Sequence, residues 1–125
     1  FETARQVLDV VGLGVRSDIA AGALSHGERR RLEIGLTVAT GARLLLLDEP
    51  LAGLGPDESA HVVALLRTLK GQAGILLVEH DMDAVFRLAD RISVLVHGRV
   101  IASGAPQAIR AHPEVRRAYL GESAA

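Results

Sequence analysis

The chain has 125 residues, of which 49% are hydrophobic, and a formal net charge of -1 from 14 basic and 15 acidic residues. This length and apolar content suit one compact domain, and the balanced charge gives no global attraction to nucleic acid or anionic lipid. The absence of cysteine excludes disulfides and thiolate metal sites and fits a reducing compartment. The longest apolar runs, 44–47 and 75–78, are far shorter than the roughly 20 residues that span a bilayer, so we expect no membrane crossing. Because the chain begins at Phe1 and has no basic-then-apolar leader, we interpret it as a fragment.

Two helices are expected in the first third of the chain. Residues Glu2–Val11 place apolar side chains at helical spacing, and glycines follow where a helix would stop. Ser25, with Glu28 three residues later, is a good N-cap for a long helix that runs to about Ala39.

Two buried parallel strands are expected next. Arg43–Leu47 is a continuous apolar run that ends in the acids Asp48 and Glu49. Pro56 then opens a helix that runs through Leu69, and Ile75–Val78 repeats the pattern of the first strand. Strands that alternate with helices predict an α/β class with parallel core strands flanked by helices.

The last third predicts a hairpin and short helices. Asp81 can cap a helix through Leu88. The β-rich runs 92–96 and 100–102 flank a His-Gly pair, which is typical of a β-hairpin turn. Short helices are expected from Pro106 and Pro113.

The ordered set Leu24–Glu28, Leu44–Glu49 and His80 carries the strongest functional signal. In its order and spacing the chain resembles the ABC ATPases, and the implied fold is the second part of a P-loop NTPase fold with a C-terminal β-hairpin. Leu24–Glu28 resembles the signature loop, usually LSGGQ, with His26 and Glu28 as departures from that pattern. Taken alone, Ser25 and Glu28 also fit an ordinary capping box.

The resemblance assigns the signature residues to the terminal phosphates of an ATP that is bound mainly by a partner subunit. Backbone N–H groups and the dipole at a helix start favour an anion, Ser25 adds a hydroxyl, and Gly27 permits close approach. Ser25, His26, Gly27 and Glu28 are therefore candidate nucleotide-binding residues.

Asp48 and Glu49 resemble the Walker B element, which implies that Asp48 supports Mg²⁺ through water and Glu49 polarises the attacking water. A paired acid at the end of a strand suits this work, although Asp48 could also simply end the strand. His80 matches the switch histidine that reaches the γ-phosphate; a lone histidine after a strand is more often a structural hydrogen-bonder. The predicted catalytic residues are thus Glu49 and His80, with ATP and Mg²⁺ as cofactors of the intact protein.

The segment between the first strand and the following helix occupies the place of the D-loop, usually SAGLDP. Gly53 belongs to this segment, and Gly55 stands where the family has an aspartate, so communication between the two ATP sites is expected to be altered. A glycine-rich linker before a proline-started helix explains the segment almost as well. The run Arg29–Arg31 is interpreted as a solvated helix face, because an aromatic content of 2% offers no stacking platform for nucleic acid.

The phosphate-binding loop GxxxxGK[ST] is missing, since Leu69 precedes the single lysine, Lys70. The glutamine loop and the aromatic adenine contact of the family are missing as well. The resemblance therefore covers the second half of the family's domain: residues 1–42 as part of the helical subdomain with the signature loop, and residues 43–125 as the C-terminal part of the ATPase core. The isolated chain is expected to be inactive.

Three segments look most similar to ATPase subunits of branched-chain amino acid importers, with urea-type relatives close behind. They are the run Arg29–Gly35 after the signature, the segment Val78–Asp83, and the ending Pro113–Val115 with Ala118–Glu122. The implied partners are a second ATPase subunit, identical or different, and transmembrane permease subunits at the cytoplasmic face of the inner or plasma membrane, without nucleic acid. A non-catalytic remnant that serves as an interaction domain stays open as an alternative. An ABC-type DNA repair or chromosome ATPase is disfavoured, because neither heptad arms nor basic grooves are present.

Overall fold

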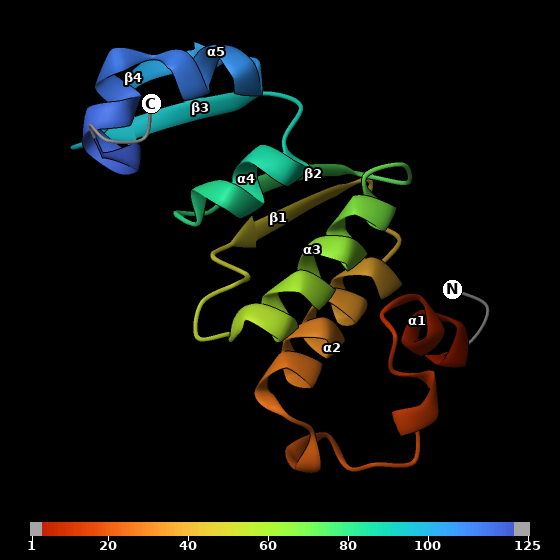
Figure 1. Cartoon of the computed structure of the whole chain (residues 1–125). Helices are drawn as coiled ribbons and strands as arrows, with labels where there is room; N and C mark the ends of the chain where they lie inside the picture. The colour runs from red at the N-terminus through yellow and green to blue at the C-terminus, as the bar shows by residue number, and fades with distance from the viewer. Residues whose placement is uncertain (1–3, 122–125) are drawn as a thin grey trace. The chain divides into compact units, whose positions relative to one another are not determined.

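The computed structural model describes residues 4–121, and its contacts divide the chain after Glu79 into two units, each described by itself (Figure 1). The first unit contains α1 (Ala4–Val10), α2 (His26–Ala39), β1 (Leu44–Asp48), α3 (Pro56–Leu69) and β2 (Gly74–Val78), with short 3-10 helices at Gly14–Arg16 and Ala21–Ala23. The second contains α4 (Met82–Leu88), β3 (Ile92–Val96), β4 (Arg99–Gly104), α5 (Pro106–Ala111), α6 (Pro113–Val115) and a π-helical turn at Arg116–Leu120.

The predicted α/β class and order of elements are confirmed. The start of the predicted first helix, at residues 2 and 3, and the end of the predicted importer-like motif, at residue 122, lie outside the described residues. A domain division at residue 42 stays a prediction. Among the described residues no helix combines the length and apolarity needed to cross a membrane.

Helix α2 starts where its capping residues predict. The Glu28 amide donates to the Ser25 hydroxyl at 3.2 Å, and the Ser25 amide donates to a Glu28 carboxylate oxygen at 2.9 Å. This reciprocal box satisfies two N–H groups that a helix start leaves without intrahelical partners. Local contacts therefore fix where α2 begins, and this start is the segment expected to bind phosphate.

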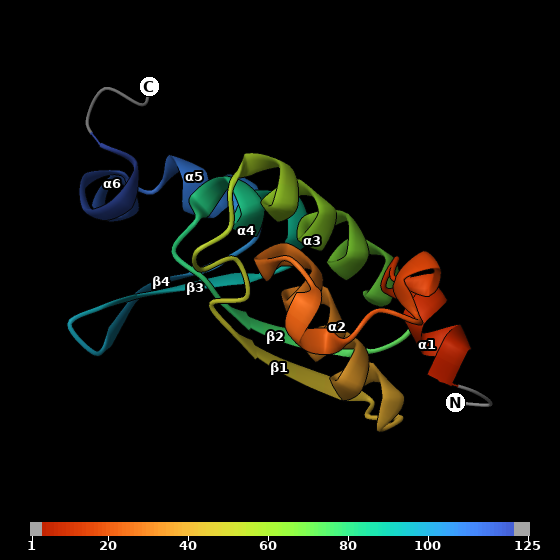
Figure 2. The ribbon, with the colours of Figure 1, turned by 90° about the horizontal axis from the view of Figure 1, so that it is seen from below.

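Strands β1 and β2 form a parallel pair in which Leu46 lies opposite Leu76 and Asp48 opposite Val78. Helices α2 and α3 lie together on one face of this pair (Figure 2). Leu45 points to that face and is only 1% exposed. Because side chains alternate along a strand, the same geometry turns a second set outward.

The outward set is apolar: Leu44, Leu46, Leu76 and Val78 are 54–67% exposed. The sequence predicts two fully buried strands, and in this chain the prediction is wrong for these four side chains. The physical reason is that this face of the pair is not covered.

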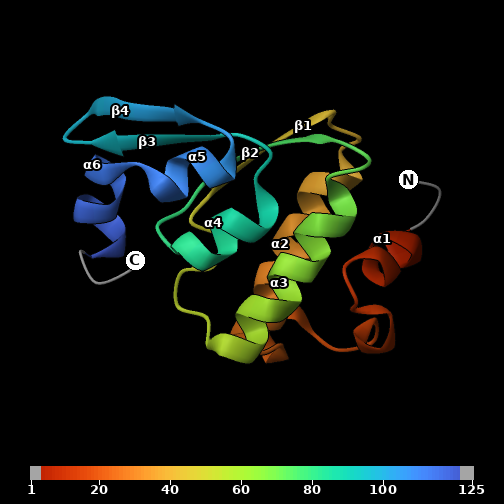
Figure 3. The ribbon, with the colours of Figure 1, turned by 45° about the horizontal axis from the view of Figure 1, so that its top comes forward.

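The second unit is a hairpin with helices packed on it (Figure 3). Strands β3 and β4 pair antiparallel across His97 and Gly98, whose φ angles of 49° and 74° are those of a two-residue hairpin turn. One buried hydrophobic cluster of this unit consists of Ile92, Val94, Ile109 and Val115. The predicted hairpin and both proline-started helices are confirmed.

Candidate functional site

The two acids of the predicted Walker B element lie at the carboxyl end of β1. Asp48 is the last residue of the strand, and Glu49 follows it with both side chains exposed. The Glu49 amide donates to the Val78 carbonyl at 2.7 Å, which extends the strand pairing by one bond. Ligands of parallel sheets bind at this edge, so the acids stand where the chemistry is expected.

Glu49 adopts a left-handed backbone with φ of 47°, one of two non-glycine residues with positive φ in the described chain. Such a conformation persists in a non-glycine residue only where its surroundings impose it. Contacts on both sides of Glu49 therefore matter for the direction of its carboxylate.

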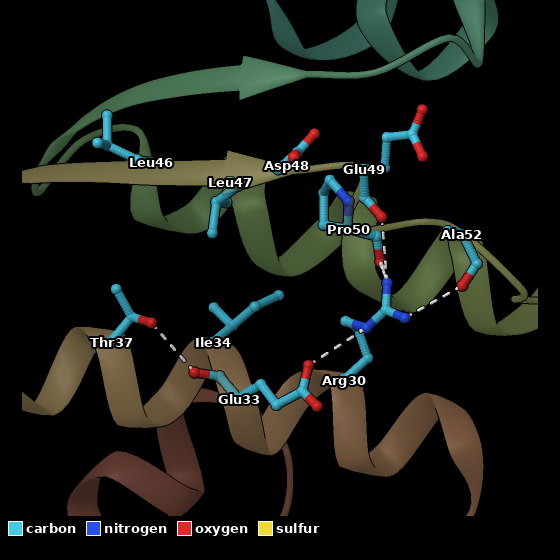
Figure 4. A pocket seen from close by; sticks show the side chains of 10 residues that line it. All are labelled: Arg30, Glu33, Ile34, Thr37, Leu46, Leu47, Asp48, Glu49, Pro50 and Ala52. Carbon is cyan, nitrogen blue, oxygen red and sulfur yellow. Dashed lines mark hydrogen bonds and ion pairs between the residues drawn. The ribbon is translucent and has the colours of Figure 1, made fainter.

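One of these contacts comes from α2 and lines an open hollow of about 480 Å³. Arg30 reaches from α2 to the loop after β1 and donates to the carbonyls of Glu49 at 3.2 Å, of Pro50, and of Ala52 at 3.1 Å (Figure 4). In the same view Leu47 points toward α2, whereas Leu46 points away from it. The hollow is lined by Arg30, Glu33, Ile34, Thr37, Leu46, Leu47, Asp48, Glu49, Pro50 and Ala52.

The arginine run differs from its sequence-based interpretation as a solvated helix face. Arg29 is exposed, but the Arg30 side chain is only 18% exposed and holds the acid-bearing loop. Arg31 donates to the carbonyls of Val11 at 3.4 Å and Gly12 at 3.3 Å. The interpretation is therefore wrong for Arg30 and Arg31, because carbonyls distant in sequence could not be inferred from a run of charges.

The predicted signature loop and the predicted D-loop segment touch each other within the first unit. A Cβ on Gly53 would lie 3.1 Å from the His26 imidazole nitrogen Nε2. The Gly27 amide donates to a Glu58 carboxylate oxygen at 3.2 Å, and a Cβ on Gly27 would lie 2.8 Å from that carboxyl group. A side chain at residue 27 would therefore force the carboxyl end of Glu58 to move.

Glu58 was not among the predicted site residues, although its carboxylate lies where the signature loop is expected to receive a phosphate. An acid in the first turn of α3 carries no sequence signal for this role, since acids are common at helix starts. The structure adds Glu58 to the predicted group of Ser25, His26, Gly27 and Glu28.

Glu28 interacts with Ser25 and Arg16 at once. The hydrogen bond from the Ser25 amide is the largest effect and holds the pKa of this carboxyl below its usual range; desolvation opposes it, and the charge of Arg16 adds to the lowering. Arg16 Nε lies 3.2 Å from one carboxylate oxygen as an ionic contact, and its Nη2 donates to the other at 3.5 Å. Glu28 is therefore charged and committed to the capping box.

The remaining predicted residues lie at element boundaries. Gly55 is the N-cap of α3 without a side-chain hydrogen bond. Glu79, directly after β2, accepts from the Leu51 amide at 3.2 Å and so holds the loop that follows Glu49. His80 is the next residue and the first of the second unit, and Asp81 caps α4 by accepting from the Ala84 amide at 3.1 Å.

Comparison with known proteins finds similarity to ABC transporter proteins. The ABC transporter family profile matches residues 2–52, and the profile of branched-chain amino acid ATP-binding cassette transporters matches residues 99–125. The chain is 42% identical over 98% of its length to the high-affinity branched-chain amino acid transport ATP-binding proteins BraF of Pseudomonas aeruginosa and LivG of Escherichia coli. Along 98% of its length the chain is therefore similar to ATP-binding proteins of ABC transporters.

A solved structure agrees with this similarity. The ADP conformation of MJ1267, an ATP-binding cassette of an ABC transporter, superposes with a TM-score of 0.85 at 30% identity and covers 97% of this chain. That alignment covers 50% of MJ1267, and the alignments with BraF and LivG cover 49% of each protein. The chain thus spans about half the length of the curated relatives it matches, and its fold is a partial P-loop NTPase fold.

The residues present fit the Mg²⁺–nucleotide chemistry of an ABC ATP-binding domain in part. Within residues 4–121 no three His, Cys, Asp or Glu side chains gather to form a protein-only metal site. Mg²⁺ is commonly held by one or two carboxylates together with water and substrate phosphates, and the exposed Asp48 suits that arrangement. At the signature loop, a phosphate would have to replace the Glu58 carboxylate on the Gly27 amide.

Proposed function

We propose that these residues are the C-terminal half of an ATPase subunit that powers an ABC importer of branched-chain amino acids. The observation that carries the proposal is the acid pair at the carboxyl end of β1, with Glu49 held in an imposed backbone conformation. The names of BraF and LivG support the choice of transported solute. Transport specificity itself belongs to the other subunits of such a system.

Each predicted catalytic residue has a defined task in this proposal. Asp48 supports Mg²⁺ through water, and the metal supplies neutralisation of phosphate charge when it is bound. Glu49 accepts a hydrogen bond from the attacking water and orients it. His80 donates from its imidazole to a γ-phosphate oxygen, which a histidine can do in either protonation state near neutral pH.

The signature residues act on nucleotide bound mainly by a second ATPase subunit. Ser25, His26, Gly27 and Glu28 lie at the start of a 14-residue helix, where backbone N–H groups favour an anion. Glu58 now occupies the Gly27 amide, so nucleotide engagement requires Glu58 to withdraw from it. Gly53 and Gly55, in the adjoining D-loop segment, contribute to the contact between subunits.

The intact protein would work at the cytoplasmic face of the inner or plasma membrane, bound to permease subunits. Apolar side chains such as Val15, which is 95% exposed in the segment between α1 and α2, are available for partner contact. A partner-mediated location agrees with the lack of a membrane-spanning helix among residues 4–121.

The proposal is tested in a full-length cassette that contains these residues. Glu49→Gln and His80→Ala should each lower the ATP turnover number by about a hundredfold or more while ATP binding is largely kept. Glu114→Gln and His61→Ala are the matched controls, because both residues are exposed and neither is a predicted site residue. Wild-type turnover in either test variant removes that residue from its role, and a full-length protein without any turnover favours the non-catalytic alternative.

A further inference from the structure

Three consecutive arginines on α2 donate to backbone carbonyls in different parts of the chain. Arg29 donates to the Gly22 carbonyl at 2.7 Å, and Arg31 donates to the carbonyls of Val11 and Gly12. These contacts tie α2 to the segment that precedes it. Arg30 points the other way, to the loop that carries Glu49.

The Arg30 guanidinium matches its surroundings closely. Nη1 donates to the carbonyls of Glu49 and Pro50, Nη2 donates to that of Ala52, and Nε lies 3.4 Å from a Glu33 carboxylate oxygen. A guanidinium is a rigid planar fork of five donors, so it can hold several carbonyls in one fixed arrangement. Lysine has the same charge but no such fork.

The contacts of Arg30 fall on the peptide groups that follow Glu49. On the other side, the Glu49 amide is already fixed by the Val78 carbonyl of β2. The Glu49 carbonyl receives the Ala52 amide at 3.1 Å in addition to Arg30. With both flanking peptides held, the left-handed backbone of Glu49 is imposed, and the backbone angles set the direction in which the side chain leaves.

We propose that Arg30 is a positioning residue that fixes the backbone of Glu49 and thereby aims the carboxylate at the attacking water. Because Arg30 lies one turn after Gly27, it also couples the signature helix to the acid-bearing loop. A change in the signature helix is then transmitted to Glu49 within the same chain. The inference rests on the role given to Glu49 in the proposed function.

The first experiment measures amide hydrogen exchange in this chain. Arg30→Gln should speed exchange at Ala52 and Leu54, whose amides bond within the loop, by about tenfold or more relative to core amides of α3 such as Leu66. Arg29→Gln removes the same charge from the neighbouring residue and should leave Ala52 unchanged. Arg30→Lys should give an intermediate rate. Unchanged exchange at Ala52, or an equal rise at Leu66, overturns the proposal, because the effect would then be absent or merely global.

The second experiment measures kinetics in the full-length cassette. Arg30→Gln should lower the turnover number about tenfold to a hundredfold with little change in the KM for ATP, because misplacement of a reacting group affects the chemical step. In the Glu49→Gln background the same substitution should cause no further loss, as expected for residues that act as one unit. A further, independent loss overturns the positioning role. Wild-type turnover of Glu49→Gln alone would instead reject the proposed function. The exchange rate at Ala52 would still test, independently, whether Arg30 fixes the backbone of the loop.

Discussion

Glu28 joins two parts of the first unit, because it closes the capping box of α2 and pairs with Arg16. Its pKa in the folded chain lies below the usual value of 4.5, first because of the Ser25 amide and then because of Arg16. A depressed pKa means that the charged form favours the folded state. This stabilisation is complete above about pH 4.5 and is lost as the pH falls through the lower, folded-state pKa.

Removal of the arginine tests this link. Arg16→Met should raise the pKa of Glu28 toward its usual value without restoring it fully, since the Ser25 amide bond is kept. Stability should then depend less steeply on pH below 4.5. A carbon-13 titration of the Glu28 carboxyl by NMR measures the first effect, and urea unfolding across the acid range measures the second.

Arg29→Met is the matched control for that titration, because its guanidinium donates to Gly22 and not to Glu28. The pKa of Glu28 should be the same in this control as in the parent chain. If Arg16→Met also left the titration unmoved, the ion pair would have no part in the charge state of Glu28.

Individual contacts of the site divide into those that sequence can predict and those that it cannot. The box between Ser25 and Glu28 joins residues three apart, so local spacing revealed it. The contact of Gly27 with Glu58 spans 31 residues, and Arg30 and Ala52 lie 22 residues apart. Such contacts depend on how α2 and α3 pack together, which a pattern of residue types along one chain does not specify.

At the scale of elements, local chemistry decided most boundaries. Pro56 in the first turn of α3 and the His97-Gly98 turn have backbone demands that few residues meet, and both were predicted. The exposure of the β1–β2 pair could not be predicted in the same way. A run of leucines indicates a strand suited to burial on both faces, but which faces are covered depends on the rest of the assembly.

Gly55 gives an element-scale prediction about α3. It occupies the N-cap with φ of -74° and ψ of 173°, values open to any residue, and a Cβ there would meet nothing within 4 Å. Gly55→Asp should therefore stabilise the chain by about 0.5–1 kcal/mol, through a new side-chain cap and a less flexible unfolded chain. Urea unfolding followed by circular dichroism measures the gain.

Gly55→Ala separates the two contributions to that gain. Alanine restricts the unfolded chain but offers no oxygen to the α3 amides. Gly55→Ala should therefore stabilise the chain only through its effect on the unfolded state, and by less than Gly55→Asp does. Equal stabilities for the aspartate and alanine variants would show that no cap forms at this residue.

At the scale of the whole chain, the apolar face of β1 and β2 predicts self-association. Leu44, Leu46, Leu76 and Val78 present a contiguous apolar surface on paired strands, and such surfaces associate in water. In a pure sample, a second copy of the chain can bury this apolar face. Light scattering should therefore give a mass above that of one chain and rising with concentration, and a concentration-independent monomer would contradict the prediction.

A charge-neutral pair of substitutions locates the contact. Leu46 and Leu76 are cross-strand neighbours, so Leu46→Glu together with Leu76→Lys places opposite charges side by side and should shift the chain toward monomer. The control is Val15→Glu with Ile19→Lys, which replaces two exposed apolar side chains outside the sheet. If the control variant dissociated to the same extent as the test variant, the self-association surface would not be the apolar face of β1 and β2.

The last prediction is that the isolated 125-residue chain does not hydrolyse ATP. Affinity for the β- and γ-phosphates in P-loop proteins comes from a glycine-rich loop and its lysine, and the GxxxxGK[ST] pattern does not occur in this sequence. The start of α2 offers an anion only about 0.3–1 kcal/mol at an exposed site, and Glu58 already occupies its Gly27 amide. Asp48, Glu49 and His80 would therefore have no bound phosphate on which to act. Phosphate release with Mg²⁺ should equal that of a Glu49→Gln chain prepared in parallel, because any activity common to both is contamination. Turnover that disappears in Glu49→Gln would contradict the prediction, because it would show that the residues of this chain bind and hydrolyse ATP without the phosphate-binding loop.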